Sequence, residues 1–159
     1  MDPMPDNPTL REATSTDRET LLALEQGVVS AERPFNDAIR DSGARYYDLD
    51  KLIADPDTLL LVGEVDGRII ATGYVQLRQS EPAFKHARHA YLGFMYVAER
   101  YRGRGINRTV IEALVDWSRR RGVMDVYLDV YVDNASAIRA YEKLGFKGLL
   151  LEMKLDPPR

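Results

Sequence analysis

The alternation of apolar and polar residues along the chain predicts its helices and strands. Short alternating or β-branched runs are typical of strands, and apolar residues three or four positions apart are typical of helices. Strands are expected over 10–13, 59–65, 68–77, 90–97, 123–132 and 149–155. Helices are expected over 17–31, 48–54, 104–121 and 134–144. This order predicts a mixed α/β fold (α+β mixed) with one central sheet of six to seven strands and about four helices.

Turn residues indicate how these elements connect. Asp66-Gly67 separates two β-rich runs and is typical of a two-residue type I′ hairpin turn. Gly122 and Gly145 follow the last two expected helices, at the position where a left-handed residue ends a helix. The order strand, long helix, strand between residues 90 and 132 predicts a parallel pair joined by a right-handed crossover.

Composition narrows the class of protein. The 159 residues are 45% hydrophobic and 30% charged, which is ordinary for one soluble domain, expected over 9–155. Residues 1–8 are expected to be loose, and they lack the apolar stretch of a signal peptide, so we expect a cytoplasmic protein. No apolar run approaches the ~20 residues of a membrane span. With no Cys and only His86 and His89, we expect neither disulfides nor a metal site.

Charge is distributed unevenly. The net charge is −3, yet seven arginines lie between Arg100 and Gly122, and acidic residues dominate between Glu32 and Asp57. Positive potential in the later half would suit an anionic ligand, and negative potential in the earlier half a cationic one, although both could be ordinary solvated faces. The acidic net charge and the absence of a base-reading motif argue against nucleic acid as a partner.

The segment between the strand ending at Val97 and the next helix carries the first chemical signal. Gly103 and Gly105 let the backbone bend tightly and let a bulky ligand approach. The helix that follows begins with N–H groups that lack acceptors, and such a helix start binds phosphate. A Walker loop is excluded because no Gly-Lys-Ser/Thr follows, and a dinucleotide fingerprint because Arg108 stands where its third glycine belongs.

A second motif lies in the last expected helix. Asn134, Ala137, Tyr141 and Gly145 are spaced so that the amide and the phenol share one helix face. Each residue also has a plain structural interpretation: a helix N-cap, a small packing residue, a half-buried aromatic and a helix stop. Only their combination with the glycine turn favours a binding site.

Together the two motifs resemble those of the GNAT family of N-acetyltransferases. Arg100-x-x-Gly103-x-Gly105 is similar to the family's acetyl-CoA motif, and Asn134-x-x-Ala137-x-x-x-Tyr141-x-x-x-Gly145 to its C-terminal motif. The resemblance extends over roughly Thr9 to Leu155. It implies a sheet whose parallel strands 4 and 5 splay apart, acetyl-CoA as cosubstrate, and transfer of the acetyl group to a primary amine by direct attack in a ternary complex.

The resemblance also implies roles for individual residues. Backbone groups of Met95, Tyr96 and Val97 would pair with the pantetheine arm like an added strand, and Asn134 would bind that arm from the other side. The N–H groups of Arg102, Gly103, Arg104, Gly105, Ile106 and Asn107 would hold the pyrophosphate. Tyr141 would act as the general acid for the departing thiolate.

Two departures from the family pattern affect these expectations. Many members have glycine at the position of Asn107, where a side chain could add or block a contact. Members often carry a catalytic Glu four residues before the position of Val97, where this chain has Gly93. These residues therefore leave the identity of the general base undecided. His89 is one candidate. The alternatives are a chain of water molecules that removes the proton, or an amine that arrives already neutral.

The acceptor is expected to be a small-molecule or peptide amine, recognised by residues 30–50 and 78–88. Phe35, Tyr46 and Tyr47 are candidate walls of its site. Asp37, Asp41 and Asp48 could attract a cation, or could simply be solvated. Because the usual Glu is missing, a non-catalytic acyl-CoA-binding sensor or interaction domain of the same fold is the alternative function. A homodimer is possible for either.

Overall fold

The computed structural model of the chain describes residues 7–159, so the expectation of a loose start over 1–8 falls mostly outside the described residues. Its strands are β1 (Thr9–Glu12), β2 (Thr58–Val65), β3 (Arg68–Gln79), β4 (Arg88–Val97) and β5 (Val126–Leu128). Its α-helices are α1 (Arg18–Glu32), α2 (Leu49–Ala54), α3 (Ile106–Arg120) and α4 (Ala135–Lys143). Two compact units divide the chain after Asp129, and they are described separately below.

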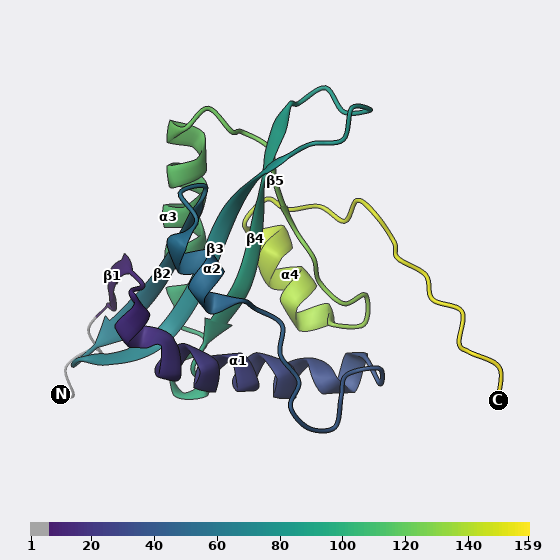
Figure 1. Cartoon of the computed structure of the whole chain (residues 1–159), viewed down its shortest axis with the longest axis horizontal. Helices are drawn as coiled ribbons and strands as arrows, with labels where there is room; N and C mark the ends of the chain where they lie inside the picture. Colours follow the sequence, from purple (N-terminus) through teal and green to yellow (C-terminus); the bar gives the residue numbers. More distant parts are fainter. Residues whose placement is uncertain (1–6) are drawn as a thin grey trace. The chain divides into compact units, whose positions relative to one another are not determined.

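The five strands form one mixed sheet in the order β1-β2-β3-β4-β5 (Figure 1). The first four strands pair antiparallel, whereas β4 and β5 pair in parallel through Ala90–Leu92 and Val126–Leu128. The expected hairpin turn is present, with positive φ at Asp66 (51°) and Gly67 (75°), as a type I′ turn requires. The mixed α/β class, the four helices and the parallel pair are thus confirmed.

Helices cover the two faces of this sheet. Tyr74 and Phe94 belong to a buried cluster with Leu21 of α1 and Leu52 of α2, so these helices cover one face. Gly73, the neighbour of Tyr74 in β3, points the opposite way because side chains alternate along a strand. A Cβ at Gly73 would meet Val110 of α3 at 3.2 Å, so α3 covers the other face.

The strand count falls short of the prediction of six to seven. Residues 149–155 form no strand, and their apolar side chains are exposed, Leu150 at 92%. The strand expected over 123–132 shrinks to β5, beyond which Val132 is 66% exposed. High β-propensity reflects how well a side chain fits a pleated sheet surface, and a strand forms only where a neighbouring backbone pairs with it.

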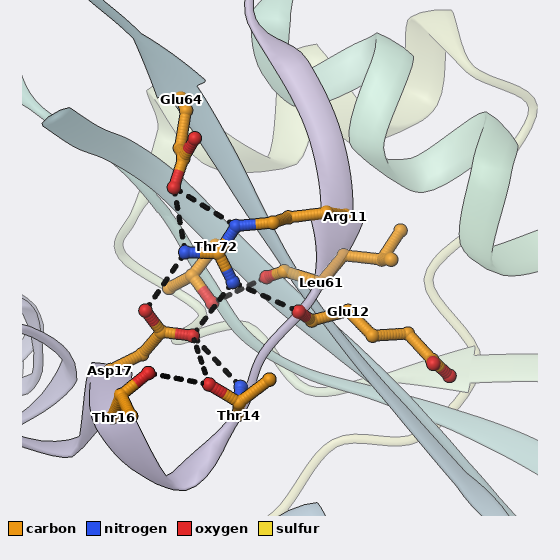
Figure 2. Close-up of polar contacts among 8 residues, drawn as sticks. All are labelled: Arg11, Glu12, Thr14, Thr16, Asp17, Leu61, Glu64 and Thr72. Carbon is orange, nitrogen blue, oxygen red and sulfur yellow. Dashed lines mark hydrogen bonds and ion pairs between the residues drawn. The ribbon is translucent and has the colours of Figure 1, made fainter. Parts of the chain in front are cut away.

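A network of charged groups joins β1 to β2 and to the start of α1 (Figure 2). The Arg11 guanidinium donates to both carboxylate oxygens of Asp17 (2.8 and 2.9 Å) and, through Nε, to Glu64 (2.9 Å). The Asp17 carboxylate also accepts from the backbone N–H of Thr14 (2.8 Å), which caps the turn before α1. These bonds lower the pKa of Asp17 to about 2 and raise the pKa of Arg11.

Among residues 7–159, no helix combines the length and the apolar character that a bilayer span requires.

Candidate active site

The middle of β4 contains a bulge at the point where β5 ends. Tyr74 of β3 pairs with Gly93, but Thr72 pairs with Tyr96, so Phe94 and Met95 together face the single residue Gly73. Phe94 has a φ of 53°, which is rare outside glycine and marks the bulged residue. The β4–β5 ladder stops at Leu92. From Gly93 onward, no described strand pairs with this edge of β4.

The bulge decides which backbone groups of β4 face the open edge. The N–H of Ala90 donates toward β5, to Asp125 (2.8 Å), whereas the N–H of Ala98 donates toward β3, to Ile70 (2.8 Å). Without a bulge, two residues an even number apart would point the same way. The backbone groups of Met95 and Val97 therefore face the open edge, and those of Tyr96 face β3.

One of these groups already has a partner. The carbonyl oxygen of Val97 accepts a hydrogen bond from the Nε of Arg102 at 2.8 Å. The Arg102 guanidinium also lies 5.4 Å from the centre of the Tyr96 ring. The side chain of Arg102 thus bridges the end of β4 and the turn that follows.

The turn between β4 and α3 exposes backbone donors at the helix start. Gly103 and Gly105 adopt φ values of 76° and 77°, and a Cβ at either would meet no atom within 4 Å. The space beside both glycines is therefore open to a ligand. The first helical hydrogen bond of α3 runs from the N–H of Thr109 to the carbonyl oxygen of Gly105 (3.1 Å), so the N–H groups before Thr109 have no intrahelical acceptor. The helix dipole adds positive potential there. The arrangement fits a diphosphate.

Asn107 is a second residue of this turn with a polar group that the described chain leaves without a hydrogen-bond partner. Its side-chain oxygen is fully enclosed and has no hydrogen-bond partner, the one buried side-chain polar atom of residues 7–159 in that state. Leaving such a group unpaired costs about 1–3 kcal/mol. The residue that departs from the family's glycine therefore offers an acceptor at the first turn of α3.

The second unit carries the other motif. The side-chain oxygen of Asn134 accepts from the N–H of Ala137 (3.2 Å), so Asn134 is the N-cap of α4 and only its NH₂ group is left to donate. Tyr141 is half-buried on α4, and its ring packs edge-on against Phe146 at 5.9 Å. The plain structural interpretation of Asn134 as an N-cap is therefore confirmed.

Gly93, where the resemblance calls for a glutamate, has no room for a side chain. A Cβ there would lie 2.2 Å from Cζ and 2.3 Å from the hydroxyl oxygen of Tyr74. The phenol of Tyr74 therefore fills the space that a side chain at 93 would take. Sequence reasoning missed Tyr74, although an aromatic residue opposite a glycine in adjacent strands is a recurrent pair.

His89, the candidate base, belongs to a different cluster. Its Nδ1 shares the Ser80 hydroxyl with Nδ1 of His86 (2.9 and 2.7 Å), and Nε2 of His86 bonds the Tyr127 hydroxyl (2.8 Å). Burial, then the neighbouring His86 and Arg78, lower the pKa of His89. His89 lies four positions before Gly93, roughly 13 Å along β4.

One expected wall of the acceptor site, Tyr47, lies against the bulge, and a second, Tyr46, packs on Tyr47. The Tyr47 ring stacks on Phe94 (4.4 Å between centres) and meets Tyr74 edge-on at 6.1 Å. Tyr46 packs against Tyr47 at 5.7 Å. The third expected wall, Phe35, is half-buried in a short helical turn.

A buried carboxylate that sequence reasoning missed holds this segment in place. Glu25 is 0% exposed, and it accepts from the backbone N–H groups of Tyr46 (2.7 Å) and Tyr47 (2.8 Å) and from Nε of Arg45 (2.8 Å). Its position on the apolar stripe of α1 gave no signal of this role. Glu25 thereby fixes the backbone that presents the two tyrosines.

The acidic residues of the first half separate into distinct roles. Asp48 is the N-cap of α2 and accepts from the N–H of Lys51 (3.1 Å), while Asp37 and Asp41 are exposed. Glu32, at the end of α1, has a pKa raised by burial and partly offset by a hydrogen bond with Tyr46. Glu32 is therefore a second carboxyl, besides Glu25, that lies beside the tyrosines.

Residues 24–146 match the model of the acetyltransferase (GNAT) family. The chain belongs to this family. The predicted family is thus confirmed by a match that includes the bulge, the glycine turn and the α4 motif.

Curated relatives share a shorter stretch. The alanine N-acetyltransferase of ribosomal protein bS18 from Escherichia coli is 44% identical over 57 residues, which are 36% of this chain and 38% of that protein. N-alpha-acetyltransferase 30 of Schizosaccharomyces pombe is 36% identical over 56 residues, 35% of this chain and 37% of the relative. The chain thus matches little more than a third of the length of these relatives.

Solved structures match over nearly the whole chain. A point mutant of the BH1408 protein from Bacillus halodurans has a TM-score of 0.85 and 26% identity, covering 94% of this chain and 99% of that one. An acetyltransferase of Clostridium acetobutylicum, solved with acetyl-CoA, has a TM-score of 0.70 and 22% identity, covering 93% of this chain and 95% of the other. At 22% identity, the likeness to the Clostridium acetobutylicum protein shows a shared fold.

Proposed function

We propose that the protein transfers the acetyl group of acetyl-CoA to a primary amine. The observation that carries this proposal is the unpaired edge of β4, which runs from the bulge at Phe94 straight into the open glycine turn before α3. An extended amide-bearing chain fits such an edge, and a diphosphate fits such a turn. The pantetheine arm and the pyrophosphate of coenzyme A follow each other in the same order.

The binding roles follow from the geometry of the first unit. The pantetheine amides would pair with backbone groups of Met95 and Val97, while Tyr96 supports this edge from its β3 side. The Val97 carbonyl oxygen already accepts from Arg102 and keeps one lone pair for a second donor. The N–H of Arg102 already donates to the carbonyl oxygen of Glu99 (3.2 Å), so it is not available as expected. The N–H groups from Gly103 to Asn107 would bind the pyrophosphate, with the side chains of Arg102 and Arg104 at its rim. We also assign the NH₂ group of Asn134 to binding of the pantetheine arm.

The chemistry is direct attack. The amine nitrogen bonds to the thioester carbon, the carbon–sulfur bond breaks, and the Tyr141 hydroxyl gives its proton to the departing thiolate. Before the attack, the ammonium form of the acceptor loses one proton to water. The second proton, released from the nitrogen as the amide forms, returns through water to the Tyr141 phenolate. At neutral pH only roughly one alkylamine in a thousand is unprotonated, so removing this proton is the larger barrier. A thiol has a pKa of ~8.5, so Tyr141 supplies the smaller contribution.

The test is a thiol-release assay with acetyl-CoA and a panel of amines. The panel holds a peptide with an N-terminal alanine, a lysine peptide with a blocked N-terminus, spermidine and free amino acids. The alanine peptide is included because a relative is named for that substrate. Saturable thiol release with an acetylated product in the mass spectrum supports the proposal. If coenzyme A at millimolar concentration gives no calorimetric heat and no melting-point shift, the proposal is wrong.

Tyr141→Phe tests the general acid. We expect kcat to fall about 10- to 100-fold, at the low end for general acid catalysis, with the Kd for coenzyme A unchanged. A mutant at the wild-type rate, with chemistry shown to be rate-limiting, would remove this role from Tyr141.

A non-catalytic acyl-CoA sensor is the second candidate, and Gly93 is the observation that favours it, since it carries no carboxylate and the Tyr74 phenol occupies the space beside it. Tight binding of acetyl-CoA without turnover on the whole panel would support that function. Sedimentation of the same preparation measures whether the protein is a homodimer.

A further inference from the structure

The space above Gly93 is the part of the site in which this chain departs furthest from its family. The phenol of Tyr74 reaches across from β3 and ends on the Gly93 backbone, one residue before the bulge. Gly93 has no side chain of its own, so the polar group at this point of the sheet is the hydroxyl of Tyr74.

That hydroxyl is free to bind. Tyr74 is 6% exposed, and its hydroxyl has no hydrogen-bond partner among the described residues. It is nevertheless not among the fully enclosed unpartnered side-chain atoms of the described residues, so its oxygen keeps a small solvent-accessible area. A buried phenol normally finds a partner for its hydroxyl. A nearly buried tyrosine whose hydroxyl is unpartnered and still accessible is therefore suited to a ligand.

Aromatic rings surround this hydroxyl. Tyr47 meets the Tyr74 ring edge-on, and the Tyr91 ring lies 6.4 Å from it. The Tyr91 hydroxyl is already used, since it donates to Asp129 at 2.9 Å, and Arg78 lies 4.0 Å over the Tyr91 ring. Of these three phenols, Tyr47 and Tyr74 therefore keep an unused hydroxyl among the described residues.

The surroundings favour a cation over an anion. Burial chiefly raises the pKa of all three phenols, and nearby carboxylates add to it: Glu32 at Tyr47, and Asp129 at Tyr91 and Tyr74. Phenol faces attract ammonium groups as well. Burial is the largest cause that raises the pKa of Tyr74, with Arg78 opposing it. The Tyr74 hydroxyl thus stays neutral at working pH and can accept a hydrogen bond, but cannot act as a general base.

We propose that the Tyr74 hydroxyl binds the acceptor amine directly and replaces the missing side chain at position 93 as the group that positions it. The acceptor is an alkyl primary amine, cationic in water, held between the Tyr47 and Tyr91 rings. This inference rests on the proposed function. It explains why the chain can lack a carboxylate at 93: the site positions the amine and leaves its proton to water.

Tyr74→Phe is the direct test, because phenylalanine keeps the packed ring and removes only the hydroxyl. We expect KM for the most active amine of the panel to rise about 3- to 10-fold, the loss of one hydrogen bond. The Kd for coenzyme A and the melting temperature should stay at wild-type values, which a merely structural role would not predict. Tyr127→Phe is the matched control: it removes a phenol hydroxyl that bonds His86, and KM should not change.

A second pair of variants tests the exchange of Tyr74 for a carboxylate. Gly93→Glu alone should lose folding or activity, since its Cβ meets the Tyr74 ring. Tyr74→Leu with Gly93→Glu relieves this clash and should regain at least tenfold over Gly93→Glu. The double variant should also show a new acidic limb in the pH profile of kcat/KM, from the introduced carboxyl.

The outcomes separate this inference from the proposed function. If the wild type acetylates an amine and Tyr74→Phe has the same KM, the role of Tyr74 is wrong and the proposed function stands. If the wild type binds coenzyme A but acetylates no amine of the panel, the proposed function fails and this inference fails with it.

Discussion

Two arginine-containing regions of the first unit differ in how their polar groups are satisfied. Around Arg11, the guanidinium and the facing carboxylates of Asp17 and Glu64 are all paired, at 2.6 to 2.9 Å (Figure 2). Between β4 and α3, the side-chain oxygen of Asn107 has no partner among the described residues, and the space beside Gly103 and Gly105 is open. The N–H groups of α3 before Thr109 likewise have no intrahelical acceptor. The paired groups around Arg11 stabilise the fold, whereas the unpaired groups between β4 and α3 are available to bind a ligand.

The largest effect on ligand binding should come from filling the open space between β4 and α3 with a side chain. Gly105→Val places a β-branched residue at a φ of 77°, where it is strained, and fills the space beside the helix start. Strain of this kind costs about 1–3 kcal/mol. We expect the Kd for coenzyme A to rise about 10- to 100-fold, measured by calorimetry. Gly67→Val, at a φ of 75° in the β2–β3 turn, is the matched control and should destabilise the fold without changing that Kd.

Breaking the ion pairs around Arg11 should lower the stability of the fold and leave the Kd for coenzyme A unchanged. Arg11→Leu leaves the nearly buried Asp17 carboxylate without its cation. Because Arg11 itself is partly exposed, we expect a loss of about 2 kcal/mol, below the range for fully buried pairs. Urea denaturation measures this loss. An Arg11→Leu protein that binds coenzyme A more weakly while still folded would contradict the division between the two regions.

The same region should set part of the acid stability. The pKa of Asp17 is about 2 in the folded protein, against an ordinary value of 3.8, chiefly because of Arg11. A lowered folded pKa stabilises the protein above pH ~4, and this contribution is lost as the pH falls toward 2. It amounts to about 2 kcal/mol. Asp17→Asn should flatten the dependence of the unfolding free energy on pH between 4 and 2, and an unchanged slope would refute the assignment.

The smallest effect is expected for an arginine pair that belongs to neither region. Arg108 and Glu112 pair at 2.9 Å on the exposed face of α3, four residues apart. Exposed pairs at this spacing contribute about 0.3–0.5 kcal/mol. Arg108→Leu should therefore change the unfolding free energy by no more than about 0.5 kcal/mol. A larger loss would mean that exposed arginines of α3 hold the fold as Arg11 does.

Local signals predicted much of the fold and one part of the site. Asp66-Gly67, Gly103 and Gly105 were recognised because their positive φ values depend on the residue itself and on its neighbours. The N-cap at Asn134 was predicted as one alternative for the same reason. The strand over 149–155 was wrong because a strand depends on a partner that local sequence does not reveal.

The acceptor side could not be predicted in the same way. Tyr74 and Gly93 are 19 positions apart, and only the register of the β3–β4 hairpin brings the phenol onto the glycine. Glu25 reaches Tyr46 and Tyr47 over more than 20 positions. An acidic residue among the apolar positions of α1 gives no sign of which backbone donors it will meet.

The sequence by itself determined the family, the helices and the glycine turn before α3, because spacing and backbone preference act over a few neighbouring residues. Only the tertiary structure decided that β4 bulges at Phe94, that its edge stays unpaired beyond β5, and that a tyrosine from β3 occupies the place of the missing glutamate. These features arise where strands distant in sequence meet, and there the choice of partner depends on register and packing across the whole sheet.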